Sequence, residues 1–464
     1  MLNFIEIAEM QDLDAIRPYL KGQKARFCDY TVGTKYQWRK VFKTYYAIYN
    51  DTLIMKESSE TFGDAFYYPI GKDEDGALLK IEEYCMKNHI LLKFCCVDDE
   101  LKEKICGIYP HVNVLPLRDF SEYVYPAENF VGYKGKKLSG QRNHVNKFKK
   151  LYQDYRFESI SNVDVDKLKA FLRENCKKEG KYLKDEYGAI SDYFENLEKL
   201  GQVGLALLVG DKIVGVTAGE VVDDTLIVHV EKADRTFEGA YPTIASAFVN
   251  FVQGVKFVNR EEDCGDLGLR TSKLQYKPCE IRTKYLCTCY TLFDRIKSPV
   301  AISVGALTVS DIEESDKHEY ARLYLDDQLN VYWGYDYRDD LNGKLPTADY
   351  FYGYQKWLKE VKEEYSFAVR ENGKMIGELV LHNFTFRGGV EMGYRFFRES
   401  QGKGYATISA TALKKFVESE LKPHRLMTRC DKRNTPSRNL IGRLGFESWY
   451  DSQTHHFFKI DYKK

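Results

Sequence analysis

Six consecutive residues near the C-terminus could bind an anion through their backbone. They are Gln401, Gly402, Lys403, Gly404, Tyr405 and Ala406, and they join an alternating apolar stretch to an amphipathic segment. A helix that begins here leaves its first N–H groups without intrahelical partners, and its dipole puts positive charge at the same end. The two glycines let an anion approach the backbone closely. The turn therefore predicts a pyrophosphate site, although an ordinary structural turn can have the same composition.

The elements expected around this turn follow a definite order in residues 300–464. Alternating apolar residues predict strands at 301–309, 366–370, 374–382, 390–397, 425–429 and 455–460, and turn-spaced ones predict helices at 312–326, 350–361, 406–417 and 436–444. Ser310 and Asp311 predict the N-cap of the first helix. Glu371-Asn372-Gly373 predicts a tight hairpin between the second and third strands.

Three motifs of this block, at their mutual spacing, resemble the GCN5-related N-acetyltransferase family. They are Tyr394-Arg395-Phe396 before the glycine-rich turn, Asn434-x-x-Ser437, and Leu444-Gly445-Phe446. The resemblance covers about residues 300–464 and is closest to the ribosomal-protein N-terminal acetyltransferases. It implies acetyl-CoA as co-substrate and direct transfer of the acetyl group to an amine, with no covalent enzyme intermediate.

The resemblance also implies how acetyl-CoA would be held. Tyr394 and Phe396 lie on the strand whose backbone would pair with pantetheine, and Asn434 would contact the same arm. Gln401 stands where relatives often carry Arg, so phosphate would be held by N–H groups. Simpler roles exist for these side chains. Tyr394 and Phe396 could fill the core, and Asn434 could cap the helix that starts at Pro436.

Two catalytic residues follow from the same resemblance. Glu391 would take a proton from the amine directly or through water, unless it is a solvated acid at a strand end. Ser437 would protonate or orient the leaving thiolate, because Ile441 stands where many relatives have tyrosine. Glu378 on the neighbouring strand is a weaker candidate. The aromatic and acidic stretch 332–337 could hold an amine, or could pack as an ordinary loop.

Composition excludes several classes of protein. Lys+Arg and Asp+Glu both number 69, so net charge gives no general attraction to nucleic acid or to a membrane surface. At 464 residues, two or three domains are expected. No stretch approaches the roughly 18 uninterrupted apolar residues of a membrane span, and the first residues lack the basic lead-in of a secretory signal. We expect a cytoplasmic protein with no membrane partner.

The eleven cysteines are odd in number and scattered, without a Cys-x-x-Cys pair or a nearby His at ligand spacing. Cys95-Cys96 and Cys287-x-Cys289 lie in apolar, β-branched or aromatic surroundings. We expect reduced core thiols, no metal site and no catalytic cysteine.

Residues 1–130 and 131–296 show the same mixture of helical and strand patterns. Helices are expected at 12–20, 76–88 and 241–251, and strands at 90–97, 204–209, 212–221 and 224–231. Together with 300–464 they make three consecutive domains of an α/β protein with mixed sheets. Short polar or proline-containing passages separate them.

Three motifs in residues 1–294 resemble soluble relatives of the C-terminal catalytic half of lysyl-phosphatidylglycerol synthases. They are Lys137-Leu-Ser-Gly140-Gln-Arg142-Asn143-x-x-Asn146-x-Phe148, then His229-Val-Glu231-Lys-Ala-Asp234, and then Asn259-Arg-Glu-Glu-Asp263 with Gly268-Leu-Arg270. The resemblance implies a tandem pair of acetyltransferase-like folds, and hence three such domains in the chain. Members of known activity move an aminoacyl group from tRNA. The membrane-embedded half is absent here, which argues against a lipid acceptor.

Two sets of residues within 1–294, one basic and one acidic, each have two interpretations. Basic residues interleaved with aromatic ones could follow a tRNA backbone, or could be the solvated face of an amphipathic helix: Tyr133, Lys134, Lys136, Lys137, Arg142, Lys147, Phe148, Lys149, Lys150 and Tyr152. Several acids could act in catalysis or bind an amine, or could belong to ordinary turns and strand ends: Glu231, Asp234, Glu261, Glu262 and Asp263.

The sequence therefore predicts an N-acyltransferase that moves an acetyl group from acetyl-CoA to a primary amine in residues 300–464. The amine would belong to a small molecule or a peptide N-terminus, and the N-terminal pair would serve recognition or a second activity. Aminoacyl-tRNA-dependent transfer by that pair is the alternative enzyme, and a binding module without turnover is the alternative without catalysis. The identity of the acceptor and the oligomeric state stay open.

Overall fold

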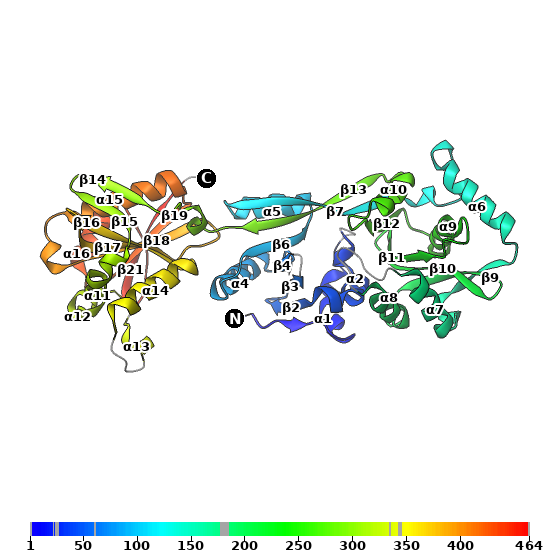
Figure 1. The fold of residues 1–464 in the computed structure, drawn as a ribbon, viewed down its shortest axis with the longest axis horizontal. Helices are drawn as coiled ribbons and strands as arrows, with labels where there is room; N and C mark the ends of the chain where they lie inside the picture. The colour runs from blue at the N-terminus through cyan, green and yellow to red at the C-terminus, as the bar shows by residue number, and fades with distance from the viewer. Residues whose placement is uncertain are drawn as a thin grey trace. The chain divides into compact units, whose positions relative to one another are not determined.

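The computed structural model describes residues 2–21, 23, 27–59, 62–176, 185–333, 336–341 and 346–462. Its contacts divide the chain into two compact units, coloured from blue to red along the chain in Figure 1. The N-terminal unit comprises residues 1–84, 92–104 and 113–288, and the C-terminal unit comprises 85–91, 105–112 and 289–464. No helix within the described ranges combines the length and apolar character that crossing a bilayer requires.

Thirteen strands among the described residues form one mixed sheet in the first part of the chain. Their bounds are β1 (Ile5–Glu6), β2 (Thr44–Tyr49), β3 (Thr52–Ser59), β4 (Gly63–Phe66), β5 (Ile70–Gly71), β6 (Leu92–Val97), β7 (Val112–Pro126), β8 (Tyr155–Ser159), β9 (Val203–Val209), β10 (Lys212–Val222), β11 (Thr225–Ala233), β12 (Phe257–Glu262) and β13 (Glu280–Cys289). The helices are α1 (Asp12–Leu20), α2 (Val32–Gln37), α3 (Arg39–Phe42), α4 (Glu74–Lys87), α5 (Asp99–Ile108), α6 (Ser139–Leu151), α7 (Val165–Asn175), α8 (Glu186–Glu195), α9 (Ala240–Val252) and α10 (Leu267–Gln275).

The order of strands shows two halves that exchange a strand. The path runs β1-β2-β3-β4-β6-β13-β7-β12-β11-β10-β9-β8, and β5 pairs with β3. In each half an antiparallel run ends in a parallel step, β4 to β6 and β11 to β12. The strand β13 then lies beside β6, and β7 lies beside β12. Both halves therefore share one continuous sheet, while the domain boundaries given by the sequence stay predictions.

Sequence periodicity accounts for many of these elements. The helix predicted at 12–20 is α1, and its apolar residues Leu13, Ile16 and Leu20 are buried on one face. The strands and helix predicted between residues 204 and 251 correspond to β9, β10, β11 and α9. The local pattern was sufficient because β9, β10 and β11 are runs of consecutive buried residues and α9 buries an apolar face.

The described part of the C-terminal unit contains an eight-stranded sheet in the order β14-β15-β16-β17-β18-β19-β21-β20. The strands are β14 (Ala301–Val304), β15 (Leu307–Asp311), β16 (Glu364–Glu371), β17 (Lys374–His382), β18 (Gly389–Phe396), β19 (Arg425–Asp431), β20 (Glu447–Asp451) and β21 (His455–Asp461). The helices are α11 (Lys317–Leu325), α12 (Asp327–Asn330), α13 (Arg338–Leu341), α14 (Ala348–Glu360), α15 (Tyr405–Phe416) and α16 (Thr435–Arg443).

Turn chemistry was predicted correctly at one hairpin and missed at another. Asn372 and Gly373 have φ values of 49° and 82° and connect β16 to β17, as the Glu371-Asn372-Gly373 motif predicts. The stretch 301–309, expected as one strand, is a hairpin, because Gly305 at φ 60° reverses the chain between β14 and β15.

The predicted helix cap at Asp311 is wrong. This residue pairs in β15, and its carboxylate accepts a hydrogen bond from the Tyr365 hydroxyl at 2.7 Å.

One core of the C-terminal unit lies between the sheet and α15. Leu379 and Leu381 of β17 and Val390 of β18 are fully buried, together with Ala410 and Leu413 of α15. A separate cluster includes Tyr320 and Tyr324 of α11 and Phe351 of α14. The sheet therefore holds β18 and the start of α15 in fixed relation.

Replacing Leu379 by alanine should lower the free energy of unfolding of this unit by about 2–5 kcal/mol, the usual cost of a cavity at a fully buried leucine. Ile408→Ala is the matched control on α15, because Ile408 is 42% exposed. Urea unfolding of both variants measures the difference. Equal destabilisation by the two substitutions would contradict the burial of Leu379 in this core.

Candidate functional sites

The glycine-rich turn before α15 has the geometry of an anion cradle. Gly402 and Gly404 have φ values of 76° and 80°, and a Cβ at either position would meet nothing within 4 Å. Gly404 is the N-cap residue of α15, and no side chain caps the helix. The first N–H groups of the helix therefore lack a side-chain cap, and they lie at the positive end of the helix dipole beside this open space.

The other predicted residues of the turn have contacts that stabilise its shape. The side-chain amide of Gln401 donates a hydrogen bond to the Phe396 carbonyl at 3.0 Å, which ties the turn to the end of β18. The Tyr405 hydroxyl bonds to the Glu371 carboxylate, and the exposed Lys403 lies near the Tyr405 ring. Ala406 packs against the core. Among these side chains, Gln401 and Lys403 are exposed, whereas Tyr405 and Ala406 are half-buried.

Strands β18 and β19 separate beside this cradle. They pair in parallel at Gly389–Arg425, Val390–Leu426 and Glu391–Met427. Beyond Glu391, β18 continues on β17 as far as Phe396, while β19 continues on β21. Within the described ladders, the edge of β18 that faces β19 has no strand partner after Glu391. An extended ligand could therefore hydrogen-bond to this edge as an additional strand.

A pair of hydroxyl groups connects β18 to α16. The Tyr394 hydroxyl lies 2.8 Å from Ser437 Oγ. Asn434 caps α16, since its side chain accepts a hydrogen bond from the Ser437 N–H at 3.1 Å, which is the simpler of the two roles considered for it. Burial raises the pKa of Tyr394 to about 12, although the bond to Ser437 opposes the shift. Tyr394 therefore stays protonated and can donate. The Phe396 side chain is buried in the core.

Glu391 is buried and partnered, so it is not a solvated acid at a strand end. Its carboxylate accepts a hydrogen bond from the Asn383 amide at 2.8 Å and lies 3.4 Å from Arg429 Nε. His382, directly opposite on β17, has Nε2 at 3.8 Å from the same carboxylate. Burial lowers the pKa of His382, and the nearby Glu391 opposes this shift. The sequence analysis missed His382, although its position beside Glu391 follows from the hairpin register.

Glu378 has a structural partner. Arg395 Nε donates to its carboxylate at 2.7 Å, and both side chains are buried. The Arg395 guanidinium lies 4.0 Å from the Tyr324 ring and 4.4 Å from the Trp333 ring. Trp333 also lies 3.6 Å from the position of a Cβ on Gly393, so it covers β18 where the strands part. Two residues of the proposed acceptor stretch, 334 and 335, lie outside the described residues.

A second candidate site is a cavity of about 1210 Å³ in the N-terminal unit. Charged and thiol-bearing residues from both halves of the sheet line it, including Asp29, Lys35, Glu57, Cys95, Cys96, His229, Glu261, Glu262 and Lys284. Strands β11 and β12 pair at Thr225–Phe257, Leu226–Val258 and Ile227–Asn259, and the cavity is lined by residues that follow these pairs on both strands. The same kind of strand separation therefore opens both candidate sites.

Lys273 bonds to the irregular end of β12, where Glu261 has a φ of 55° and the register with β7 shifts. Its Nζ donates to the carbonyl groups of Arg260, Glu261 and Glu262, at 2.5 Å, 3.0 Å and 2.5 Å. The side chain is buried, and burial lowers the pKa of Lys273. A protein amine thus satisfies the acceptors of β12.

His229 lies between two carboxylates at the cavity wall. Its Nδ1 is 2.7 Å from Glu261 Oε1, and its Nε2 is 3.0 Å from Glu220 Oε1. Burial alone lowers the pKa of His229, but the two hydrogen-bonded carboxylates outweigh it and raise the pKa to about 10. The imidazole is therefore held as a cation, with both nitrogens occupied.

Lys284 joins acids from distant parts of the sequence. Its Nζ lies 2.8 Å from Glu122 and 3.7 Å from Glu262, and it also pairs with Asp29. Burial raises the pKa of Glu262 to about 7, while Lys284 opposes the shift. A register shift between Asn259 and Glu262 in the ladder with β7 accompanies the turn of Glu261 and Glu262 toward the cavity. A carboxyl with a pKa near neutrality in a cavity is a candidate proton acceptor or amine ligand.

The remaining acids named from the sequence have structural partners. Glu231 pairs with Arg260, Asp234 with Lys212, and Asp263 with Arg270. In the basic stretch, the Arg142 guanidinium donates to the carbonyls of Tyr133 and Gly135, at 2.6 Å and 3.0 Å. The lysines of this stretch are exposed: Lys134, Lys136, Lys137, Lys147, Lys149 and Lys150. Sequence reasoning missed four further residues of the cavity, because none of them belongs to a motif or spacing pattern. They are Asp29, Lys35, Glu57 and Lys284.

Comparison with known proteins assigns both parts of the chain. A family model for the C-terminal part of phosphatidylglycerol lysyltransferase matches residues 23–288. The chain belongs to this family. A model of the acetyltransferase (GNAT) domain matches residues 306–447. Both resemblances seen in the sequence are confirmed, as is the mixed α/β class with a tandem acetyltransferase-like region and a C-terminal GNAT domain. Both family descriptions name group-transfer enzymes, so acyl or aminoacyl transfer is the class of chemistry that these folds support.

Three similar proteins have names that state no substrate. The first is a conserved protein of unknown function from Bacteroides thetaiotaomicron VPI-5482, whose structure has been solved. Its sequence is 30% identical to this chain, and the two structures match with a TM-score of 0.57. That match covers 62% of this chain and 99% of the other. Protein MYCGA3080 of Mycoplasmoides gallisepticum is 26% identical over 172 residues, which is 36% of this chain and 55% of the relative. The uncharacterized N-acetyltransferase YnaD of Bacillus subtilis is 28% identical over 83 residues, 18% of this chain and 49% of the relative. The chain thus spans about half the length of these two curated relatives.

The carboxylates around His229 should make stability depend on pH in the alkaline range. The pKa of His229 is about 10 in the folded protein and 6.5 for a free imidazole. The charged His229 therefore contributes its full stabilisation below pH 6.5, and this stabilisation is lost as the pH rises to about 10. The stability difference between wild type and His229→Gln should therefore narrow over that range by at least about 1.4 kcal/mol, the equivalent of one pKa unit. Urea unfolding at a series of pH values measures it. Parallel stability profiles of the two proteins would contradict the charged imidazole.

Proposed function

We propose that the C-terminal domain transfers an acetyl group from acetyl-CoA to a primary amine, and that it acts in the cytoplasm. The separation of β18 and β19 supports this most directly, because it leaves a strand edge on which an extended chain such as pantetheine can form hydrogen bonds. The open N-terminus of α15, with glycines at positions 402 and 404, provides donors for a pyrophosphate beside that edge.

Bound acetyl-CoA would supply the reactive thioester, so the protein has to position the amine and move protons. Glu391 and its neighbour His382 are the groups able to accept the amine's proton, directly or through water. On the other side of β18, Tyr394 and Ser437 form a hydroxyl pair that can donate a proton to the departing thiolate. Trp333, which covers Gly393, would enclose the acceptor, a small amine or a peptide N-terminus.

Acetyl-CoA should raise the melting temperature of the full-length protein, and Gly404→Glu should abolish the rise. Ligand at about 100 times its Kd stabilises the folded state by about 2.7 kcal/mol. A glutamate at the open position 404 places a side chain and a negative charge where the pyrophosphate would lie. Thermal unfolding with and without acetyl-CoA measures both effects.

Gly254→Glu is the matched control, because Gly254 also has a positive φ, 74°, and open space around its Cβ position, but lies in the N-terminal unit. It should keep the full response to acetyl-CoA. A response that survives in Gly404→Glu, or that is absent from the wild type, would count against the proposal.

Aminoacyl transfer from tRNA in the N-terminal unit is the second candidate. The large cavity supports it, because Glu261 and Glu262 face into it and could bind or deprotonate an amine. The exposed lysines on and before α6 offer phosphate contacts. Arg142 is excluded from that set, since its guanidinium already bonds to backbone carbonyls.

If tRNA binds through this lysine-rich surface, replacing Lys136 and Lys137 by alanine should weaken binding at low salt. It should also reduce the slope of log affinity against log salt concentration by about 2, one for each lost phosphate contact. Fluorescence anisotropy with labelled tRNA at several salt concentrations measures both. The control is the Lys167→Ala/Lys199→Ala double variant, which removes two other exposed lysines of the same unit. Equal slopes for the two double variants would exclude this surface.

A further inference from the structure

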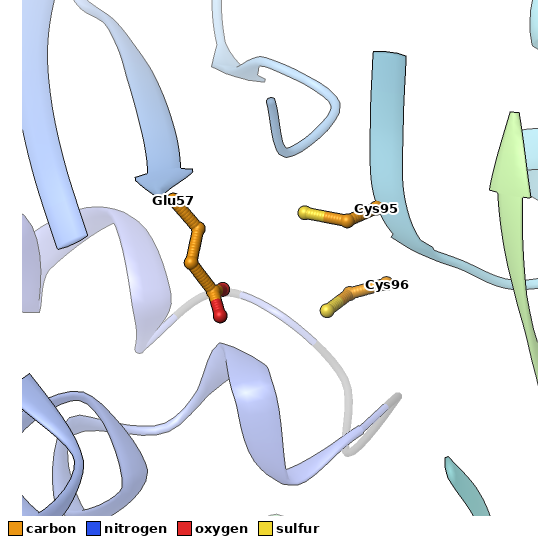
Figure 2. A group of neighbouring side chains, drawn as sticks. All are labelled: Glu57, Cys95 and Cys96. Atoms are coloured by element: carbon orange, nitrogen blue, oxygen red, sulfur yellow. The ribbon is translucent and has the colours of Figure 1, made fainter. Parts of the chain in front are cut away.

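Three potential metal ligands meet at the wall of the N-terminal cavity. A carboxylate oxygen of Glu57 and the sulfur atoms of Cys95 and Cys96 all lie within 4.8 Å of one another. Figure 2 shows both thiols directed toward the side on which the Glu57 carboxylate lies. All three residues line the cavity, so an ion could reach them from it. We propose that Glu57, Cys95 and Cys96 bind a zinc ion.

The backbone of β6 departs from regular strand geometry at this point. Successive side chains of a strand point to opposite faces, so two adjacent cysteines would normally diverge. Cys96 has a φ of 51°, a conformation that residues other than glycine adopt rarely. A hydrogen bond from the Tyr30 hydroxyl to the Cys96 carbonyl, at 3.2 Å, supports it. The result is that both sulfur atoms reach the same carboxylate.

A second set of contacts orients the carboxylate. Glu57 Oε2 accepts a hydrogen bond from the Tyr67 hydroxyl at 2.5 Å, and Tyr67 in turn accepts one from Lys35 at 2.5 Å. Hydrogen-bonded neighbours of this kind orient ligands in metal sites. The Asp29 carboxylate accepts a hydrogen bond from the Cys96 thiol and also pairs with Lys284.

The donor set selects the metal. Two sulfur atoms and a carboxylate oxygen suit a borderline-soft, tetrahedral ion, and zinc is bound by cysteine and acidic side chains in this way. Three protein ligands leave one position for Asp29 or for a group within the cavity. On binding, each thiol loses its proton to solvent as the metal–sulfur bond forms. Packing in the core would explain why the two cysteines are buried. It would not explain why both thiols lie beside a carboxylate at the wall of a cavity.

The test uses the tag-free, full-length chain after metal has been removed by a chelator. Isothermal titration calorimetry with zinc should give one site per chain. Titration with cadmium should give the ultraviolet charge-transfer band of a metal–thiolate bond. Cys95→Ser, Cys96→Ser and Glu57→Gln should each weaken zinc binding by more than the ~10–100-fold that loss of a group behind a ligand costs.

Cys176→Ser is the matched control, because Cys176 lines the same cavity outside the cluster. It should bind zinc like the wild type and keep the cadmium band. The melting temperature of each metal-free variant, compared with metal-free wild type, separates loss of binding from loss of folding. The proposal is overturned if the folded Cys95→Ser/Cys96→Ser double variant binds zinc like the wild type. It is also overturned if cadmium binds to the wild type without a thiolate band. Neither result depends on acetyl transfer.

Discussion

Parallel strands that pair over three residues and then part determine where both candidate sites lie. In the C-terminal unit β18 leaves β19 after Glu391, and in the N-terminal unit β11 leaves β12 after Ile227. Strand separation exposes backbone donors and acceptors that need partners. In the N-terminal unit Lys273 bonds to three carbonyls of β12. Along β18, among the described residues, the bond from the Gln401 side chain reaches the last carbonyl of the strand, that of Phe396. The C-terminal opening is therefore the one suited to a ligand that pairs with the backbone, whereas the N-terminal opening suits a ligand recognised by side chains.

Buried charge defines the chemistry of the N-terminal opening. His229 is held between two acids, and Lys284 is held among three. Breaking such a set leaves an uncompensated buried charge, which costs more than the pairing itself contributes. The arrangement therefore fixes the shape of the cavity and leaves Glu262, whose pKa is near 7, as its most readily titrated acid. A surface with these carboxylates favours a positively charged ligand, such as an amine or a metal cation. It disfavours an anionic ligand.

Features encoded by local sequence were predictable, and features that depend on distant pairing were not. The glycine turn at 401–406 and the amphipathic helix after it carry their own conformational signals, so their positions could be predicted from residue type alone. The cap expected at Asp311 failed because the strand ladder and the Tyr365 hydroxyl offered stronger partners than a helix N-terminus. The meeting of Glu57 with Cys95 and Cys96 required the parallel step from β4 to β6 and the positive φ of Cys96. Neither leaves a spacing pattern in the sequence.

The departure of this chain from the usual acetyltransferase pattern at Ile441 has a structural counterpart. Ile441 is fully buried, so a tyrosine hydroxyl is replaced there by an apolar core contact. Ser437 lies one turn earlier on α16, on the same face of the helix, since residues four apart are neighbours. Tyr394 reaches that serine from β18 with its hydroxyl at 2.8 Å. A strand hydroxyl and a helix hydroxyl therefore meet one turn from the position that Ile441 occupies. Because burial raises the pKa of Tyr394 to about 12, its hydroxyl stays protonated near neutral pH and can donate a hydrogen bond at the gap between β18 and α16.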